Sequence, residues 1–360
     1  MSEQIQDIDA LRAFSGQVSA SIAGGLNCAL TLLGDQLGLY RALAEGGPLR
    51  SQQLADSTHL AERWVREWLY QQACMQQVSY NEADDTFYLT REARAVLADE
   101  SHPAYLGGMF QSVVSIYDTV DQLPDCFRTG VGQSFDDKGE NCACGIERMS
   151  KKFQNDHLVP DLLPRLESVI DKLEAGALVA DVGCGGATST IAMARAFPNS
   201  TFIGYDISQH ALNRARNNIN GAGVKNISLH NPVDRPLPGD ASFDLITTFD
   251  VIHDSTHPAQ LIEAIRASLK DDGTWLCADV KGFPSFAENL KDNPMAPLAY
   301  SFSVLVCMSA GLSTPDGAGL GTLGFHEQKA RTMTAELGFK RFRHIPFEGD
   351  VFNAFYEIRP

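Results

Sequence analysis

Residues 177–208 read ALVADVGCGGATSTIAMARAFPNSTFIGYDIS, and this stretch decides the fold of the chain. A short apolar run, Leu178–Val182, is followed by a cluster of glycines and then by an amphipathic segment. A second apolar run, Thr201–Tyr205, ends at an acid, Asp206. The pattern predicts a strand, a glycine turn, a helix and a second strand. Such a βαβ unit binds adenosine-type ligands at the C-terminal end of its first strand.

Two motifs compete for the glycine turn. A dinucleotide-binding turn has the pattern G-x-G-x-x-G, which Gly183 and Gly185 begin, but its third glycine position holds Thr188. The other pattern, D/E-x-G-x-G-x-G, is found in class I methyltransferases that use S-adenosylmethionine. Asp181, Gly183 and Gly185 fit this pattern, and Ala187 stands at the place of its last glycine. The turn therefore resembles the methyltransferase pattern more than the dinucleotide pattern.

The side chains around the turn suit the same cofactor. Gly183, Gly185 and the adjacent Gly186 lack the Cβ atoms that would block a close approach of backbone to ligand. Asp181 is expected to point an acid at the positively charged amino end of the cofactor. Asp206 can accept hydrogen bonds from both ribose hydroxyls. A pyrophosphate would be repelled by an acid at position 181, so the pair of acids favours S-adenosylmethionine.

The composition indicates an ordinary globular protein of two domains, with 360 residues that are 44% hydrophobic and 21% charged. Its net charge of −16 disfavours nucleic acid or an anionic membrane as a partner. The polar first residues predict no secretory signal, and no apolar run approaches the roughly 18 residues of a membrane span. Eight scattered cysteines predict reduced thiols and a cytoplasmic location.

Cys142 and Cys144 form a C-x-C pair, which is compatible with a metal or arsenical site. No second pair of ligands stands nearby in the sequence, and ordinary thiols are the alternative interpretation. We therefore expect no metal site in this chain.

Residues 1–100 are expected to form a winged-helix domain rich in helices. Helical segments, including an apolar face of Trp64, Val65, Trp68 and Leu69, precede two short β-rich runs around an acidic turn. This region has seven Arg, no Lys and fourteen Asp or Glu, whereas a domain that binds DNA needs a basic face. We therefore expect a dimerisation module and a homodimer.

The alternation of strand and helix continues after Asp206. Further strands are predicted at Asn226–His230, Phe243–Phe249, Thr274–Asp279, Phe339–Ile345 and Val351–Ile358, with an exposed loop at 129–145 and a helix at 147–173. The predicted regions are a winged-helix domain (1–100), a helical linker and substrate cover (101–172) and a catalytic domain (173–360). A Pro- and Gly-rich insertion at 282–324, with one apolar helix-like run at Tyr300–Leu312, is expected to be a lid over the site.

The ordered set of segments resembles the S-adenosylmethionine-dependent methyltransferases that pair an N-terminal winged helix with a class I Rossmann-like domain. The resemblance covers about residues 20–358 and is carried by GDQLGLYRALAEGGPL, REWLYQQA, DVGCGGATS, FDVIHD, NPMAPLAY and GAGLGTLG. It implies an α/β fold with a seven-stranded sheet, and a winged-helix dimer that helps to wall the acceptor pocket. The implied cofactor-binding residues are Asp181, Gly183, Gly185, Gly186, Asp206, Asn231 on the adenine side, and Phe249.

A hydroxyl acceptor must lose its proton during methyl transfer. His253 and Asp254 follow the fourth strand at the expected cofactor edge, and a histidine, with an ordinary pKa of about 6.5, can act as a general base. These two are the candidate catalytic residues. The alternative is that His253 borders the cofactor and Asp254 caps the next helix. Further candidates for the acceptor pocket are His157, His326, Tyr117 and Tyr300.

The predicted function is S-adenosylmethionine-dependent methyl transfer to a small-molecule acceptor. An amine, thiolate or thioether needs little help from a base, so the sequence leaves O-, N- and S-methylation open. Two other classes are weighed against it. A ligand-responsive winged-helix transcriptional regulator is disfavoured by the acidic N-terminal region, and an NAD-type oxidoreductase is disfavoured by Thr188.

Overall fold

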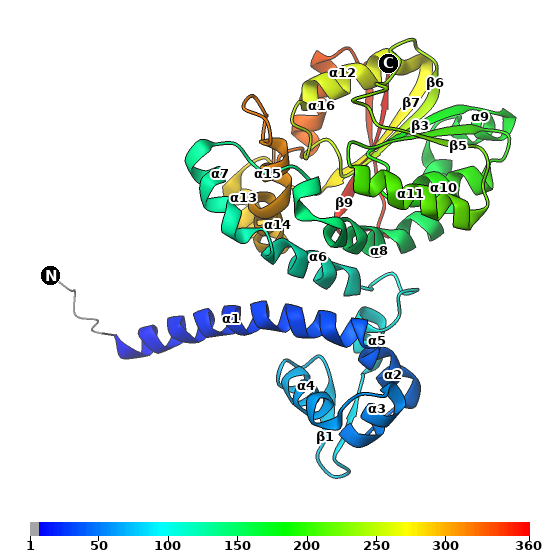
Figure 1. Ribbon diagram of the computed structural model, residues 1–360. Helices are drawn as coiled ribbons and strands as arrows, with labels where there is room; N and C mark the ends of the chain where they lie inside the picture. The colour runs from blue at the N-terminus through cyan, green and yellow to red at the C-terminus, as the bar shows by residue number, and fades with distance from the viewer. Residues whose placement is uncertain (1–6) are drawn as a thin grey trace. The chain divides into compact units, whose positions relative to one another are not determined.

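The chain divides between Val114 and Ser115 into two units, each with its own core (Figure 1). The computed structural model describes residues 7–360. Within these residues, no helix combines the length and the apolar character that a membrane span requires. The division into three regions at residues 100 and 172 stays a prediction.

The first unit contains five helices and a β-hairpin among its described residues. They are α1 (Ile8–Gln36), α2 (Leu39–Gly46), α3 (Ser51–Thr58), α4 (Glu62–Cys74), β1 (Ser79–Asn81), β2 (Thr86–Tyr88) and α5 (Arg91–Leu97). The antiparallel pairing of β1 with β2 confirms the predicted hairpin, and with it the winged-helix arrangement. Helix α6 (Gly107–Tyr117) spans the division between the units.

Trp68 anchors the core of the first unit. Its indole lies edge-on to Tyr40 and donates a 2.9 Å hydrogen bond to the backbone carbonyl of Leu30. A Cβ atom at Gly34 would lie 2.3 Å from this indole, so glycine permits the close approach of α1 to α4. The prediction that Trp64 belongs to the same apolar face is wrong, because its side chain is 81% exposed.

The second unit is built on a seven-stranded sheet, as predicted. The strands are β3 (Leu178–Val182), β4 (Thr201–Tyr205), β5 (Ile227–His230), β6 (Phe243–Phe249), β7 (Leu269–Val280), β8 (Arg341–Ile345) and β9 (Asn353–Arg359). Their order is β5-β4-β3-β6-β7-β9-β8; β9 pairs antiparallel with both β7 and β8, and the other pairs are parallel. The order reverses at β3, which places a topological switch point at the C-terminal end of this strand.

Helices cover both faces of the sheet, because alternate residues of each strand enter opposite cores. In β3, Val179 packs with α9 (Val169–Ala175) and α10 (Thr188–Ala196), whereas Ala180 packs on the side of α12 (Pro258–Ser268) and α16 (Glu327–Glu336). Helix α11 (Gln209–Ala222) packs beside α10 (Figure 1). The loops that follow the parallel strands therefore gather at one edge of the sheet.

The expected exposed loop at 129–145 is wrong. A 3₁₀ turn (Asp136–Lys138) and α8 (Glu140–Asp156) follow α7 (Leu123–Thr129), and both Lys138 and Cys142 are buried. Lys138 can be buried because its ammonium group donates to the side chains of Gln133 and Thr119. The high content of acidic residues had suggested solvent on all sides.

Two further segments differ from the prediction. The expected helix at 147–173 ends at Asp156 and gives way to a π-helical turn (Leu158–Leu162) and a 3₁₀ turn, because Pro160 and Pro164 cannot donate backbone hydrogen bonds. The insertion at 282–324 is mainly helical in its first two thirds. Its elements are α13 (Phe286–Asp292), α14 (Ala296–Phe302), a π-helical turn (Ser303–Cys307) and α15 (Met308–Gly311). Its role as a lid stays a prediction.

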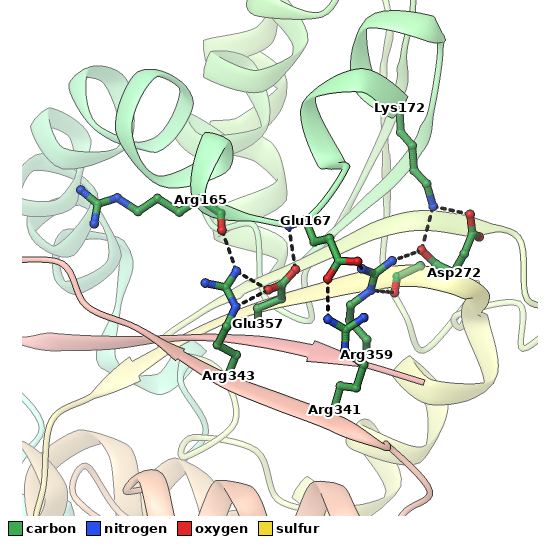
Figure 2. A network of polar contacts seen from close by, with 9 residues as sticks. Arg165, Glu167, Lys172, Asp272, Arg341, Arg343, Glu357 and Arg359 are labelled. Carbon is green, nitrogen blue, oxygen red and sulfur yellow. Dashed lines mark hydrogen bonds and ion pairs between the residues drawn. The ribbon is translucent and has the colours of Figure 1, made fainter.

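A polar network fastens the antiparallel edge strands to the segment before β3 (Figure 2). The carboxylate of Glu357, which is 2% exposed, pairs with Arg343 and accepts the backbone N–H of Glu167 at 2.9 Å. Arg343 also donates to the backbone carbonyl of Arg165 at 2.6 Å. Because Arg343 is half exposed, its loss would leave the buried carboxylate of Glu357 with the N–H of Glu167 as a remaining partner. This network therefore stabilises the side of the sheet formed by β8 and β9. These strands lie far from the glycine turn in the sequence.

Candidate functional site

The glycine turn after β3 has two glycines in the left-handed region, with φ of 71° at Gly183 and 53° at Gly185. A Cβ at Gly183 would lie 2.3 Å from the side chain of Val251, so the chain itself requires glycine there. A Cβ at Gly185 would meet no protein atom within 4 Å. The backbone of Gly185 is therefore open on the side where a Cβ atom would lie.

The third motif position keeps the backbone conformation of a glycine although the residue is alanine. Ala187 has a φ of 61°, is fully buried and immediately precedes α10. A left-handed conformation costs an L-residue roughly 1–2 kcal/mol. The substitution at this position therefore adds a local energetic cost and leaves the path of the turn unchanged.

Gly186 faces the protein. Its Cβ would lie 2.1 Å from the carboxylate of Glu147, which forms an ion pair with Arg214 and accepts the amide of Asn218 at 3.0 Å. The same amide donates to the backbone carbonyl of Gly186 at 2.8 Å. These contacts explain why residue 186 lacks a side chain, and its role in cofactor binding stays a prediction.

Asp206 links the end of β4 to the glycine turn. One carboxylate oxygen accepts the backbone N–H of Gly185 at 2.8 Å, and the other accepts the N–H of Ser208 at 2.8 Å. Burial raises the pKa of Asp206, and the two N–H donors oppose this shift. Each oxygen keeps a further lone pair, so the half-buried carboxylate can still accept hydrogen bonds from a ligand.

Asp181 supports the turn from inside the protein. Its carboxylate is 1% exposed and accepts the hydroxyls of Ser189 and Thr190, both at 2.6 Å, and of Thr247 at 2.8 Å. Burial raises the pKa of Asp181 in spite of these three donors. The expected direct contact with an amino group stays a prediction, and in this structure the carboxylate binds β6 and α10.

Two other predicted cofactor residues flank the same edge. Asn231 follows β5, where its side-chain oxygen accepts the N–H of Val233 at 2.9 Å and its amide donates to the carbonyl of Ile207 at 3.3 Å. Phe249 ends β6 and packs, partly buried, on the α10 side of the sheet. Both residues lie at carboxyl ends of parallel strands, as the prediction requires.

Sequence reasoning missed Asp136 in this region. One of its oxygens accepts the N–H of Gln209 at 3.3 Å, and the other is buried without a hydrogen-bond partner. Its charge contributes to the raised pKa of Asp206. Asp136 lies in a segment that the sequence predicts to be an exposed loop. No sequence pattern therefore marks it as a site residue.

His253 is enclosed by two acids at the neighbouring strand ends. Its Nδ1 lies 2.6 Å from Asp279 in β7, and its Nε2 lies 3.2 Å from Asp254. The side chain is only 2% exposed. Burial opposes the charged form of the ring, but the carboxylates of Asp279 and Asp254 outweigh it, so the pKa of His253 is raised well above its ordinary value. The protonated form of the ring is therefore favoured.

Two more groups complete this cluster and were not predicted as site residues. Asp250 has a φ of 57° and accepts the side-chain amide of Asn353 at 2.8 Å. Burial by surrounding protein, and then the charge of Asp279, raise the pKa of Asp250, although the residue is exposed to solvent. The thiol of Cys307 lies on the other side of His253. Asp279 could have been identified as a site residue from the sequence, because it ends a predicted strand. No sequence pattern marks Cys307 as a site residue.

The remaining candidates have local partners. His157 pairs with Asp161 at 2.7 Å and packs against Phe347, and the side chain of His326 accepts the N–H of Lys329 at the start of α16. Tyr300 packs against Phe286, and Tyr117 is 44% exposed at the end of α6. The prediction that these four line an acceptor pocket stays untested. Cys142 and Cys144 belong to no group of three possible metal ligands within residues 7–360.

Two parts of the chain match known families. Residues 173–313 match the family described as "Methyltransferase domain", and residues 25–99 match the "Rv2258c-like winged HTH domain". Among curated proteins, the ubiquinone biosynthesis O-methyltransferase of Actinobacillus pleuropneumoniae serotype 7 (strain AP76) is 31% identical over 144 residues. That match covers 38% of this chain and 60% of the length of the relative.

Solved structures share the fold along nearly the whole chain. A protein from Nostoc punctiforme PCC 73102, described as a candidate O-methyltransferase, is similar with a TM-score of 0.73 and 18% identity, covering 99% of this chain and 100% of that one. Human N-acetylserotonin methyltransferase, solved in complex with S-adenosylmethionine, is similar with a TM-score of 0.66 and 15% identity, covering 100% and 99%. The predicted class I methyltransferase fold behind a winged helix is thereby confirmed.

Proposed function

We propose that this chain, whose methyltransferase domain follows a winged-helix domain, transfers a methyl group from S-adenosylmethionine to a small-molecule acceptor. The hydrogen bond from Gly185 to Asp206 carries this proposal, because it joins an open glycine backbone to an acid at the switch point of the sheet. Ligands of such sheets bind in this position. The family matches support the same reaction class.

The residues at this edge fit the cofactor. The open side of Gly185 leaves room for the methionine part, and the free lone pairs of Asp206 can accept the ribose hydroxyls. Asn231 would border the adenine. Asp181 would act indirectly, by holding β3, β6 and α10 together beneath the turn. When bound, S-adenosylmethionine supplies an electrophilic methyl group on a sulfonium centre.

The task of the remaining residues is to orient the acceptor and to exclude water, since methyl transfer is an in-line displacement. The side chains of His253 and Asp254 lie at the end of β6, beside the strand that carries the glycine turn. We assign them to the acceptor side. A hydroxyl is the proposed acceptor, because the curated relative is named as an O-methyltransferase.

We also propose that the chain forms a homodimer through α1. The C-terminal part of this 29-residue helix packs with the first unit through Asn27, Thr31 and Leu32. Along its length the helix exposes a stripe of apolar side chains, which is Ile8, Leu11, Phe14, Val18, Ile22, Leu26 and Leu33. Exposed apolar stripes of this length mark interaction surfaces. A second copy presents the same stripe, so a symmetric pairing would cover both.

A cytoplasmic location is proposed because all eight cysteines are free thiols. The cofactor assignment is tested by calorimetric titration of the full chain with S-adenosylmethionine and with NAD. Binding of S-adenosylmethionine alone supports the proposal. Binding of NAD alone would replace it by an oxidoreductase.

A further inference from the structure

Three different ligand types converge on one point beside β6. A ring nitrogen of His253, a carboxylate oxygen of Asp254 and Sγ of Cys307 all lie within 4.8 Å of one another. An imidazole nitrogen, a carboxylate oxygen and a thiolate sulfur are the donors that zinc uses in proteins. The cysteine arrives from a π-helical turn, Ser303–Cys307, and such turns are frequent at functional sites.

The spacing of the first two donors suits a shared metal ion. Nε2 of His253 lies 3.2 Å from Oδ1 of Asp254. Two ligands bound at about 2.0–2.1 Å in a tetrahedron are about 3.3 Å apart. Oδ1 of Asp254 is also buried, and Nε2 of His253 is its only partner among the described residues. A cation between the two atoms would bind both of them in place of the proton on the ring.

Asp279 is the hydrogen-bond partner of the ring nitrogen of His253 that would not bind the metal. Its Oδ1 lies 2.6 Å from Nδ1 of His253, and the acid is 1% exposed. Histidines that bind metals usually donate their second ring N–H to a carboxylate, which turns the other nitrogen toward the ion. Asp250, His253 and Asp279 also form a group of close donors, but 2.6 Å is a hydrogen-bond distance and is too short for two ligands of one ion.

We propose that His253, Asp254 and Cys307 bind one divalent transition-metal ion of the zinc type and leave a fourth position open. The sequence predicts no metal site, because Cys307 lies in a different segment from the other two ligands. Occupancy of this site does not depend on methyl transfer. The competing arrangement is a protonated His253 held between two carboxylates, which needs no metal.

The role of the ion in catalysis rests on the proposed function. A hydroxyl acceptor bound at the open position would have a lowered pKa, as zinc-bound water does. Its proton would leave to water, and the resulting alkoxide oxygen would bond to the methyl carbon. The bond between that carbon and sulfur would break, which converts the sulfonium into a neutral thioether.

The test measures metal binding by the full chain without a histidine tag. The wild type, stripped with a chelator and titrated with Co²⁺, is expected to bind one equivalent with a thiolate-to-cobalt charge-transfer band. Cys307→Ser should abolish the band, and Asp279→Asn should weaken binding about 10–100-fold. Cys74→Ser and Cys144→Ser are matched controls, which should bind as the wild type does. These two cysteines lie outside the cluster.

Two outcomes would overturn the site. One is wild-type protein that binds Co²⁺ no more tightly than Cys307→Ser, and the other is binding without the thiolate band. Both outcomes are measured on the wild type or by comparing a variant with the wild type. Thermal unfolding of each variant shows whether it is folded. Titration of the stripped wild type with S-adenosylmethionine tests the proposed function separately, because cofactor binding is expected to be unchanged by removal of the metal.

Discussion

The carboxylate of Asp206 accepts a 2.8 Å hydrogen bond from the backbone N–H of Gly185, and so the end of β4 is joined to the glycine turn after β3. The second oxygen of Asp206 is fixed by the N–H of Ser208. The acid and the open backbone of Gly185 are therefore held in place by the chain itself. A site that is organised in this way loses less conformational freedom when its ligand binds.

Asp206→Asn is expected to weaken S-adenosylmethionine binding by about 10–100-fold. The amide can keep the hydrogen bond from Gly185, but it loses the charge, and hydrogen bonds to charged groups contribute about 1.5–3 kcal/mol. Asp240→Asn is the control, because this exposed acid changes the net charge equally. Calorimetry compares the three proteins. Equal affinity of Asp206→Asn and the control would remove Asp206 from the ribose site.

Asp181→Asn is expected to change the pH dependence of stability. Burial raises the native pKa of Asp181, whereas the unfolded chain ionises near the ordinary value of about 3.9. Between the two values the native state retains a proton that the unfolded state releases, so this carboxyl lowers stability as the pH rises. Asparagine cannot ionise.

The free energy of unfolding of Asp181→Asn, relative to wild type, should therefore increase between about pH 4 and pH 7. Denaturant unfolding at both pH values measures it, with the exposed Asp234→Asn as the control. A difference that is constant with pH, or that falls, would show that the carboxylate is ionised in the native protein.

The exposed stripe of α1 predicts that two charges placed on it prevent dimer formation. The double variant Phe14→Asp and Ile22→Asp should be monomeric by light scattering, because each change buries a charge in a symmetric apolar contact. The control changes Val233 and Val351, which are exposed and lie in the second unit, to Asp. A wild type that is already monomeric, or a double variant that stays dimeric, contradicts the proposed interface.

The sheet could be predicted closely from the sequence. The bounds of β3, β4 and β6 agree with the predicted residues, because each is a short buried run that glycines or acids terminate. Strand β7 begins earlier than predicted, at Leu269, where the pairing with β6 is irregular between Phe243 and Leu245. Such a bulge depends on the neighbouring strand and leaves no local pattern.

The site could be predicted only in part. The spacing of Gly185 and Asp206 gave their positions, because strand ends in a parallel sheet share an edge. The hydroxyls that surround Asp181 could not be anticipated, since serine and threonine are common at any helix start. Cys307 lies in a predicted helix-like run, but its position beside His253 depends on how the insertion packs and leaves no local pattern in the sequence.

The central claim is that the open side of Gly185 receives S-adenosylmethionine, and calorimetric titration of Gly185→Ala tests it most directly. A Cβ there meets no protein atom within 4 Å, and Ala187 shows that the turn tolerates alanine at a similar φ. Gly223→Ala is the matched control, since that glycine has a φ of 69° and equally open surroundings at the end of α11. We expect normal binding by wild type and control, and binding at least about tenfold weaker by Gly185→Ala, since 1.4 kcal/mol of steric cost suffices for that factor. Unchanged affinity in Gly185→Ala, or no binding by the wild type, would contradict the account.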